Sequence, residues 1–276
     1  MQFEEGWVGA AGEQSDRSPE ERARGMKRHL GTSDAPSEEE RLRFVQAGFA
    51  AAAPLYDALT RLFSFGLDSR WRRCCLDACR LRPGDSLLDV ATGTAKLAIE
   101  GARMAQSTGK VAGVDSCREM LLEARKNARK SGARITLVQG KAELLPFKDE
   151  QFDCLTVGFA LRHVSHLVGT LKEMVRVLRP GGRLAIVEFT RPDSAPARWL
   201  LFTYLSVVVP PLVGLLSRSW LTFRLARYLP MSIARFMSGE GLRHRVEDAG
   251  LVTVGSRRFF AGLVSVCVGV KPDLAA

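Results

Sequence analysis

Short apolar runs and helix-period patterns alternate along the middle of the chain. The run Leu87–Val90 is bounded by turn residues, as expected of a buried strand, and a helical pattern follows from Thr94. Further strands are predicted at 110–115, 135–139, 152–159 and 183–190. Helices are predicted at 116–130 and 167–178, the second stopped by the Arg-Pro-Gly-Gly run at 179–182. This alternation predicts an α/β domain with a parallel sheet covered by helices on both faces.

The pattern changes on either side of this region. Residues 39–80 carry apolar side chains at mixed spacings of three and four, which predicts helices, with Pro54 starting or breaking one. Residues 236–249 are a predicted helix that ends at Gly250. Two strands, 251–257 and 262–270, then follow at a hairpin-like spacing. We expect the last strand to run antiparallel to the rest.

Residues 199–216 are almost continuously apolar, with no charge before Arg218. Their length is borderline for a membrane span. Pro210 and Pro211 would remove backbone hydrogen bonds from a spanning helix, so two short helices meeting at the prolines are favoured, with a span as the alternative. Residues 218–235 mix aromatic and leucine side chains with four arginines. They suit either an interfacial surface facing acidic lipid or an ordinary amphipathic helix with a solvated basic face.

The turn after the first strand is the leading candidate for ligand binding. In open α/β sheets, ligands bind where a strand feeds a turn and a helix N-terminus. A dinucleotide fingerprint needs three glycines, whereas only Gly93 is present, so Asp89 beside one small turn suits a ligand with an amino group better than one with phosphates. An ordinary strand–turn–helix without a ligand is the alternative. Asp115 follows about 20 residues later, where an acid binds ribose in nucleotide-binding units, unless it only caps the next helix.

Composition narrows the class of protein. The 276 residues carry a net charge of +10, which allows nucleic acid or an anionic membrane as partner. Six cysteines form no CxxC pair, so we expect reduced core thiols in a cytosolic protein and no metal site. Residues 1–38 are rich in Gly, Ser, Glu and Arg, which predicts a disordered charged tail with a short basic helix at 20–30. Early carboxylates argue against a signal peptide.

Several segments together resemble one family over about residues 40–272. They are Leu-Leu-Asp-Val-Ala-Thr-Gly-Thr (87–94), Ala-Glu-Leu-Leu-Pro-Phe (142–147), Phe-Ala-Leu-Arg-His-Val (159–164), Glu-Met-Val-Arg-Val-Leu-Arg-Pro-Gly-Gly-Arg-Leu (173–184), Val-Glu-Phe (187–189) and Tyr-Leu-Pro-Met-Ser-Ile (228–233). Their order and spacing resemble the ubiquinone/menaquinone-biosynthesis C-methyltransferases, which depend on S-adenosylmethionine. The Pro-Gly-Gly run alone is typical of any class I methyltransferase, whereas the Phe-x-Leu-Arg segment and the last segment narrow the resemblance to quinone enzymes.

This resemblance implies a Rossmann-like class I methyltransferase. Its seven-stranded sheet would be mostly parallel, with an antiparallel last strand. The implied organisation is a tail (1–38), an N-terminal helical cap (39–80) and a methyltransferase domain (81–272) that contains a helical lid insertion (195–235).

The resemblance also implies positions for the cofactor. Asp89, Gly93 and Thr94 would lie at its methionine end, and Asp115 would accept hydrogen bonds from the ribose hydroxyls. In the third-strand loop, Ala142 would lie by the adenine, beside Lys141. Gly158 would stand at the end of the fourth strand, next to the transferred methyl.

The implied substrate is a prenylated quinol ring, benzoquinol or naphthoquinol, methylated on carbon. Its neighbouring phenol must lose a proton, with an ordinary pKa near 10. Arg162 matches the family's arginine and would stabilise the phenolate or hold a water. The family usually has Asn next, whereas this chain has His163, whose imidazole would take the proton directly or only hydrogen-bond backbone. Tyr56 would close over the substrate from the cap.

Two lysines depart from the family pattern. Ala95 is followed by Lys96 where the family has an acid, and Lys141 stands where an Asp or Asn often binds the adenine amino group. An ammonium has no acceptor, and a cation near a sulfonium is unfavourable unless it is screened. The lid is also more basic than is usual in the family. These changes predict either that the adenine is held by backbone contacts and stacking alone or that the protein binds its cofactor more weakly. They also allow a divergent enzyme that acts on another phenolic substrate.

Two other classes of function compete with the enzyme. A non-catalytic membrane-surface scaffold that binds quinone or partner enzymes would explain the lysines, but the intact Asp89, Asp115 and Arg162 count against it. A nucleic-acid methyltransferase would explain the charge, but aromatic side chains are not interleaved with the basic tail, so we expect no nucleic-acid partner. The apolar lid and the basic residues suit a polyprenyl tail presented from an anionic membrane. We therefore expect a cytoplasmic enzyme, peripheral at the inner face of the membrane, with a homodimer as a further possibility.

Overall fold

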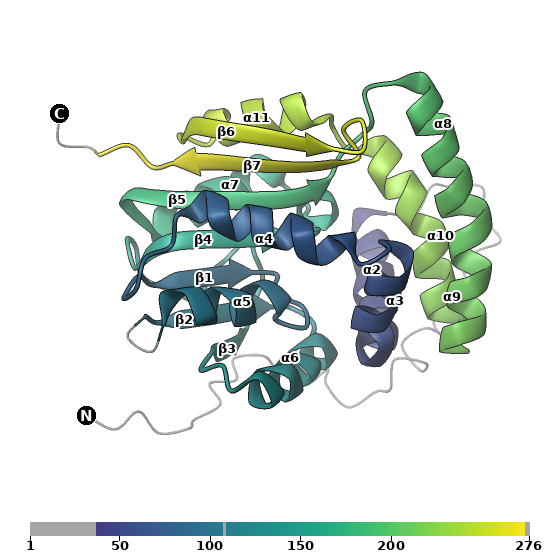
Figure 1. Cartoon of the computed structure of the whole chain (residues 1–276), viewed down its shortest axis with the longest axis horizontal. Helices are drawn as coiled ribbons and strands as arrows, with labels where there is room; N and C mark the ends of the chain where they lie inside the picture. The colour runs from purple at the N-terminus through teal and green to yellow at the C-terminus, as the bar shows by residue number, and fades with distance from the viewer. Residues whose placement is uncertain (1–36, 107–108, 274–276) are drawn as a thin grey trace.

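The computed structural model describes residues 37–106 and 109–273, which form one seven-stranded sheet (Figure 1). The predicted tail and its basic helix at 20–30 lie outside these residues. The sheet has the order β3-β2-β1-β4-β5-β7-β6. Its strands are β1 (Leu87–Val90), β2 (Val111–Asp115), β3 (Thr136–Gln139), β4 (Phe152–Gly158), β5 (Leu178–Phe189), β6 (Val252–Phe259) and β7 (Val264–Val270).

Strands β1 to β5 are parallel, and β7 runs antiparallel to both β5 and β6. The predicted parallel sheet with an antiparallel last strand is therefore confirmed. All four residues of β1 are buried because helices cover both faces of the sheet. The register aligns Val90 with Val114 and Val157, so the carboxyl ends of β1, β2 and β4 lie along one edge.

Helices α4 (Leu67–Cys79), α5 (Lys96–Ala105) and α6 (Arg118–Ser131) contribute to the core on one face of the sheet. Helices α7 (Leu167–Val177) and α11 (Gly239–Asp248) contribute to the core on the other. The link between β3 and β4, residues 140–151, has no helix, so the alternation is not continuous. A loop near the strand ends takes the place of a helix there.

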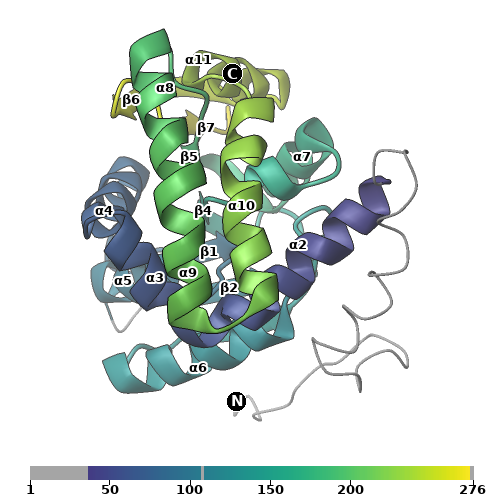
Figure 2. The same ribbon diagram turned by 90° about the vertical axis from the view of Figure 1, so that its right-hand side faces the viewer.

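Helices of two segments, residues 38–63 and 195–235, lie together beyond the carboxyl ends of the parallel strands, and from here on both together are called the cap (Figures 1 and 2). It begins with α2 (Glu38–Ala52), whose start is fixed by reciprocal hydrogen bonds between Ser37 and Glu40. A 3₁₀ turn (Ala53–Leu55) carrying Pro54 and helix α3 (Tyr56–Phe63) follow. The later segment adds α8 (Ala195–Thr203), α9 (Val209–Ser217) and α10 (Trp220–Arg235). The two parts of the cap meet where Phe44 of α2 packs edge-on against Tyr228 of α10.

The expected break at Pro210 and Pro211 does not occur. A five-residue π-helical turn, Tyr204–Val208, joins α8 to α9, so residues 195–217 form one continuous helical run. The prolines occupy the first turn of α9, and the wider turn before them accommodates their missing N–H groups. By length and composition this 23-residue helix is one that can cross a membrane, with 22% of its most apolar window buried. One such helix is weak evidence for a span, and its inner side packs on the protein.

One strand begins earlier than its sequence predicts. Helix α7 ends at Val177 as expected, but β5 starts at once at Leu178 and includes the Arg-Pro-Gly-Gly run. The pairing with β4 is irregular between Phe152 and Cys154, which indicates a bulge. Gly181 adopts a φ of +72° there and donates its N–H to the Lys271 carbonyl, 2.9 Å away. A turn sequence is thus accommodated within a strand.

Candidate active site

The turn after β1 is built around two buried carboxylates, the first of which is Asp89. Its side chain accepts hydrogen bonds from the hydroxyls of Thr92 (2.6 Å) and Thr156 (2.7 Å) and is almost fully buried. Burial raises its pKa to about 6, and the two hydroxyls oppose this rise. Asp89 therefore links β1, β4 and the turn, and its direct contact with a cofactor stays a prediction.

Asp115 at the end of β2 holds the same turn from the other side. Its two oxygens accept the N–H groups of Gly93 and Cys117, each at 2.8 Å. Burial raises its pKa, and these backbone bonds lower it. Gly93 has a φ of +56°, and a Cβ built on it meets no atom within 4 Å. The turn thus faces open space beside a carboxylate that keeps lone pairs for further donors.

The cap is tied to this turn by a polar network. Thr94 donates its hydroxyl to Asp57 of α3 at 2.7 Å. Lys96, at the start of α5, lies 3.4 Å from Asp57 and 3.1 Å from the almost fully buried Asp68 of α4. Asn127 of α6 donates to both Asp57 and the Thr94 carbonyl. The lysine that departs from the family pattern therefore has two carboxylate partners, which offset its charge toward a cationic ligand.

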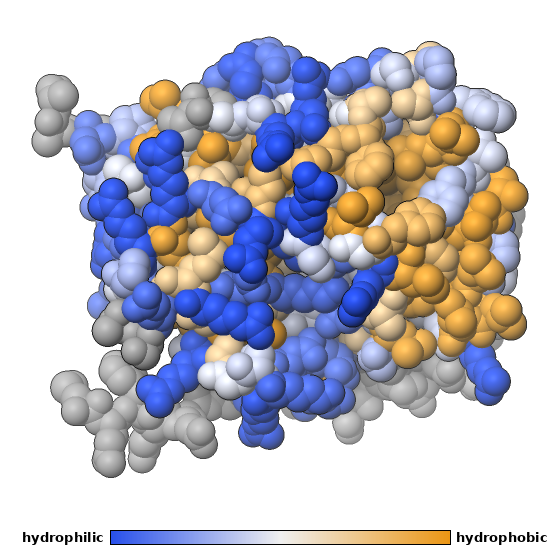
Figure 3. Space-filling model, viewed as in Figure 1, coloured by the Kyte–Doolittle hydropathy of each residue, from blue (hydrophilic) through white to orange (hydrophobic). Residues whose placement is uncertain are grey.

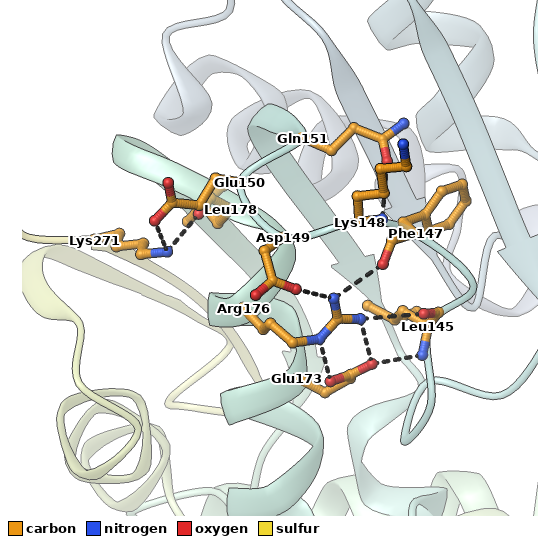
Figure 4. Close-up of polar contacts among 10 residues, drawn as sticks. All are labelled: Leu145, Phe147, Lys148, Asp149, Glu150, Gln151, Glu173, Arg176, Leu178 and Lys271. Atoms are coloured by element: carbon orange, nitrogen blue, oxygen red, sulfur yellow. Dashed lines mark hydrogen bonds and ion pairs between the residues drawn. The ribbon is translucent and has the colours of Figure 1, made fainter.

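The loop between β3 and β4 is held by a compact ion-pair cluster (Figure 4). Arg176 of α7 makes a two-pronged contact with Glu173 at 2.7 and 2.8 Å and reaches Asp149 at 2.6 Å. The same guanidinium donates to the carbonyls of Leu145 and Phe147. Glu173 in turn accepts the Leu145 N–H, and its pKa is lowered chiefly by Arg176. The cluster fixes the loop without a helix.

This loop carries the two residues predicted to lie by adenine. Ala142 is half-buried, whereas Lys141 is exposed and makes an isolated backbone bridge with Leu144. Water therefore screens the Lys141 ammonium. Gly158, at the end of β4, has no room for a side chain, because a Cβ there would lie 2.9 Å from a Leu97 methyl and 3.3 Å from the Arg72 guanidinium.

A cavity of about 200 Å³ lies between the cap and the strand ends. Helices α2 to α4 form one side of it, the 195–235 segment forms another, and the ends of β4 and β5 reach it. The walls are mostly aromatic and aliphatic, including Phe49, Leu59, Phe63, Trp71, Phe159, Phe189, Leu205, Val209, Val213 and Leu229. All three predicted catalytic residues, Tyr56, Arg162 and His163, line this one cavity.

Arg162 forms a buried ion pair with Glu188 of β5. Its Nη1 lies 2.5 Å from a Glu188 oxygen and also donates to the Phe159 carbonyl at 2.7 Å. Burial raises the Glu188 pKa, against the lowering by the arginine. The Arg162 Nε is buried and has no hydrogen-bond partner among the described residues. Phe159, which lines the cavity, has a φ of +58°, and this backbone conformation is strained for a bulky residue.

His163 is enclosed by rings instead of hydrogen-bond partners. Its ring centroid lies 5.6 Å from that of Phe49 and 5.9 Å from that of Tyr228. Both imidazole nitrogens are buried and unbonded within the described chain, so the reading of a histidine held by backbone is wrong. Burial, followed by the charges of Arg162 and Arg41, holds the pKa of His163 well below its ordinary value. The imidazole is thus neutral at pH 7.

Tyr56 borders the cavity from the start of α3, next to the residue that bonds Thr94. Its ring packs edge-on against Phe49, with centroids 6.0 Å apart. Its predicted closing over a substrate stays a prediction. Among the described residues, no three His, Cys, Asp or Glu side chains are grouped to hold a metal ion.

Residues 35–271 match the ubiE/COQ5 methyltransferase family. Curated relatives of this chain carry the name ubiquinone/menaquinone biosynthesis C-methyltransferase UbiE. The relative from Escherichia fergusonii is 35% identical over 237 residues, 85% of this chain and 93% of the relative. One from Escherichia coli O1:K1 is 34% identical with the same coverage.

The chain belongs to the ubiE/COQ5 methyltransferase family. It is an S-adenosylmethionine-dependent methyltransferase, as the resemblance of its motifs implies. A methyltransferase structure from Aquifex aeolicus, 19% identical, aligns with a TM-score of 0.53 over 72% of this chain and 88% of its own. The [4+2]-cyclase SpnF, 18% identical, aligns at 0.61 over 88% and 98%. Likeness at this identity shows the class I fold alone.

The residues of this methyltransferase fit its cofactor. The open space above Gly93 and the free lone pairs of Asp115 suit a ribose at the end of β2, and Ala142 lies on the loop fixed by Arg176.

Sequence reasoning missed Glu188, Asp57 and Asp68 as members of the site. Glu188 belongs to the Val-Glu-Phe segment at 187–189. A carboxylate inside an apolar predicted strand could have marked it as a candidate site residue. Asp57 and Asp68 lie in segments that also resemble the family, but their contacts with Lys96 gave no signal in the sequence, because Lys96 lies on another element.

Proposed function

We propose that this methyltransferase transfers a methyl group to a ring carbon of a prenylated quinol, where it replaces a ring hydrogen that leaves as a proton when the ring regains its aromaticity. The observation that carries the proposal is that Arg162, His163 and Thr222, which line one mostly apolar cavity, all have buried polar atoms without a hydrogen-bond partner among the described residues. The buried Nε of Arg162 and both imidazole nitrogens of His163 lack partners within the described chain. Buried polar groups without partners are costly, so a ligand oxygen is expected to satisfy them.

The cavity walls suit the rest of such a substrate. Trp71, Phe159 and Phe189 pack edge-on or tilted to one another with centroids 4.6 to 6.3 Å apart, which provides flat faces for a ring. The aliphatic side chains of the 195–235 segment continue the apolar lining away from these rings. An isoprenoid tail is stable there because water is excluded.

Each polar residue has a role in making the ring carbon nucleophilic. His163, neutral at pH 7, accepts the hydroxyl proton, and Arg162 donates a hydrogen bond to the phenolate oxygen that forms. The resulting imidazolium and phenolate attract each other, which offsets the low basicity of a buried imidazole. Glu188 positions the guanidinium and balances its charge before the proton moves.

The cofactor-binding residues then orient the reaction. S-adenosylmethionine, when bound, supplies an electrophilic methyl group on a sulfonium centre. Asp115 would hold the ribose, Gly93 and Thr94 the methionine end, and Ala142 would lie by the adenine. Gly158 lets Leu97 and Arg72 pack closely against the end of β4, which would fix the strand end between the turn and the cavity, where the methyl and the ring carbon would meet.

We place the enzyme in the cytoplasm at an anionic membrane surface, because a prenylated quinol resides in the bilayer. The net charge of +10 favours this association. A homodimer stays a prediction, which sedimentation of the purified chain would test.

The test is methylation of a demethylated quinol with a short, water-soluble prenyl tail. Arg162→Met is expected to lower kcat about 100-fold or more, because the phenolate loses its donor. His163→Asn is expected to lower kcat by a similar factor and to change the pH profile. His166→Asn is the matched control, because His166 is exposed and only caps α7. An unchanged rate and pH profile in His163→Asn would remove the base assignment, and full activity in Arg162→Met would refute the proposed site.

A further inference from the structure

The helical run 195–217 has two apolar sides. Its inner side, with Leu201, Leu205 and Val213, lines the cavity. Its outer side exposes large apolar side chains that no described part of the chain covers, and Figure 3 shows this hydrophobic surface at the end of the molecule where Figure 1 draws α8 and α9. The exposed residues, with Trp220 at the start of α10, are Trp199 (71%), Leu200 (66%), Val207 (64%), Leu215 (73%), Leu216 (51%) and Trp220 (63%).

The charged residues within the segment that carries this outer face are all of one sign. Residues 194–239 contain no Asp or Glu but five arginines. Arg198 stands near the start of the helical run and Arg218 directly after its end, while Arg227 and Arg235 are exposed on α10. In a helix that lies in the membrane interface, arginine side chains extend to the lipid headgroups while the apolar face contacts the acyl-chain boundary. This arrangement complements an anionic bilayer, whereas two copies of the same face would bring arginines together.

We infer that the outer face of residues 195–217, with Trp220, is an interfacial anchor that lies flat on an anionic bilayer. A helix that spans the bilayer would expose its cavity-lining side to lipid, whereas a flat helix keeps that side on the protein. The cavity then lies about one helix diameter, roughly 10 Å, from the lipid. The use of such an anchor rests on the proposed function, because it would let the prenyl tail of the substrate pass directly from the bilayer into the cavity.

The test compares the wild type with Leu215→Glu/Leu216→Glu, two exposed residues outside the cavity lining. Leu122→Glu is the matched control, because Leu122 is a 48% exposed leucine on α6. Cosedimentation uses vesicles of phosphatidylcholine with about one quarter phosphatidylglycerol, and vesicles of phosphatidylcholine alone. The wild type and the control are expected to bind the anionic vesicles and to show a blue shift of tryptophan emission. The double variant is expected to bind at least about 10-fold more weakly.

Activity separates this inference from the proposed function. The double variant is expected to retain wild-type kcat on the short-tailed soluble quinol and to lose activity on a long-tailed quinol in anionic vesicles. Vesicle binding by a wild type that methylates neither quinol would leave the anchor standing and refute the proposed function. Equal vesicle binding by the wild type and the double variant would overturn the anchor. So would a wild-type dimer that the double variant dissociates, because a second copy would then cover this face.

Discussion

Lys96 offers a sharp test of how the cap is held over the cofactor turn. Lys96→Met removes the cation shared by Asp57 and Asp68 and leaves the Asp68 carboxylate, 1% exposed, with a weaker partner in Arg72 at 3.8 Å. Removing one member of a buried ion pair costs about 3–5 kcal/mol. Because Lys96 is itself 24% exposed and Arg72 remains, we expect a loss of about 2 kcal/mol in the free energy of unfolding.

The assay is urea unfolding of the full chain, supported by thermal melting. A loss of about 2 kcal/mol corresponds to a fall of about 4–8 °C in Tm for a chain of this size. Lys126→Met is the matched control, because Lys126 is 62% exposed in its pair with Glu123 and should change stability by less than about 0.5 kcal/mol. Adding Asp68→Asn to Lys96→Met should recover part of the loss. Equal stability of Lys96→Met and Lys126→Met would refute the reasoning.

Three further outcomes follow from the site. Arg176→Met should raise the Kd for S-adenosylmethionine about 10-fold in calorimetry, since the loop carrying Ala142 loses its anchor; an unchanged Kd would separate the loop from the cofactor. The depressed pKa of His163 means that the unfolded chain binds more protons below about pH 6.5, so the free energy of unfolding falls as pH drops, by up to about 1.4 kcal/mol per pH unit. Urea unfolding at about pH 7.5 and 5.5 should show a smaller fall in His163→Asn, and an equal fall would contradict the burial. Gly158→Ala should lower kcat about 10-fold, because its methyl would meet Leu97 at 2.9 Å and displace the end of β4, and an unchanged kcat would show that this close packing is not needed for catalysis.

The strands were predictable from sequence because the central ones are buried on both faces. Leu87–Val90 has no solvent-facing position, so its run of mostly apolar residues is enough to predict a buried strand. The early start of β5 was not predictable, because the Arg-Pro-Gly-Gly run reads as a turn and only its pairing within the sheet places it in a strand. The continuous helix through Pro210 and Pro211 likewise depends on a π turn that sequence propensity does not encode.

The candidate site, like the fold, has residues that the sequence identified and contacts that only the tertiary structure shows. Arg162, His163 and Tyr56 were named from motifs, and their common cavity required the packing of the cap on the sheet. Lys96 looked unfavourable in sequence because its partners Asp57 and Asp68 lie 39 and 28 positions away on other helices. Charge balance of this kind is a property of tertiary structure, so a substitution at one position cannot be judged from that position alone.

The central claim is that this chain methylates a quinol carbon through Arg162 and His163. The most direct measurement incubates the purified chain with isotopically methyl-labelled S-adenosylmethionine and a short-tailed demethylated quinol under reducing conditions, with the product followed by mass spectrometry and NMR. We predict label on a ring carbon in the wild type and its near absence in Arg162→Met. Binding of S-adenosylmethionine without any labelled quinol, or label found on oxygen, would contradict the account.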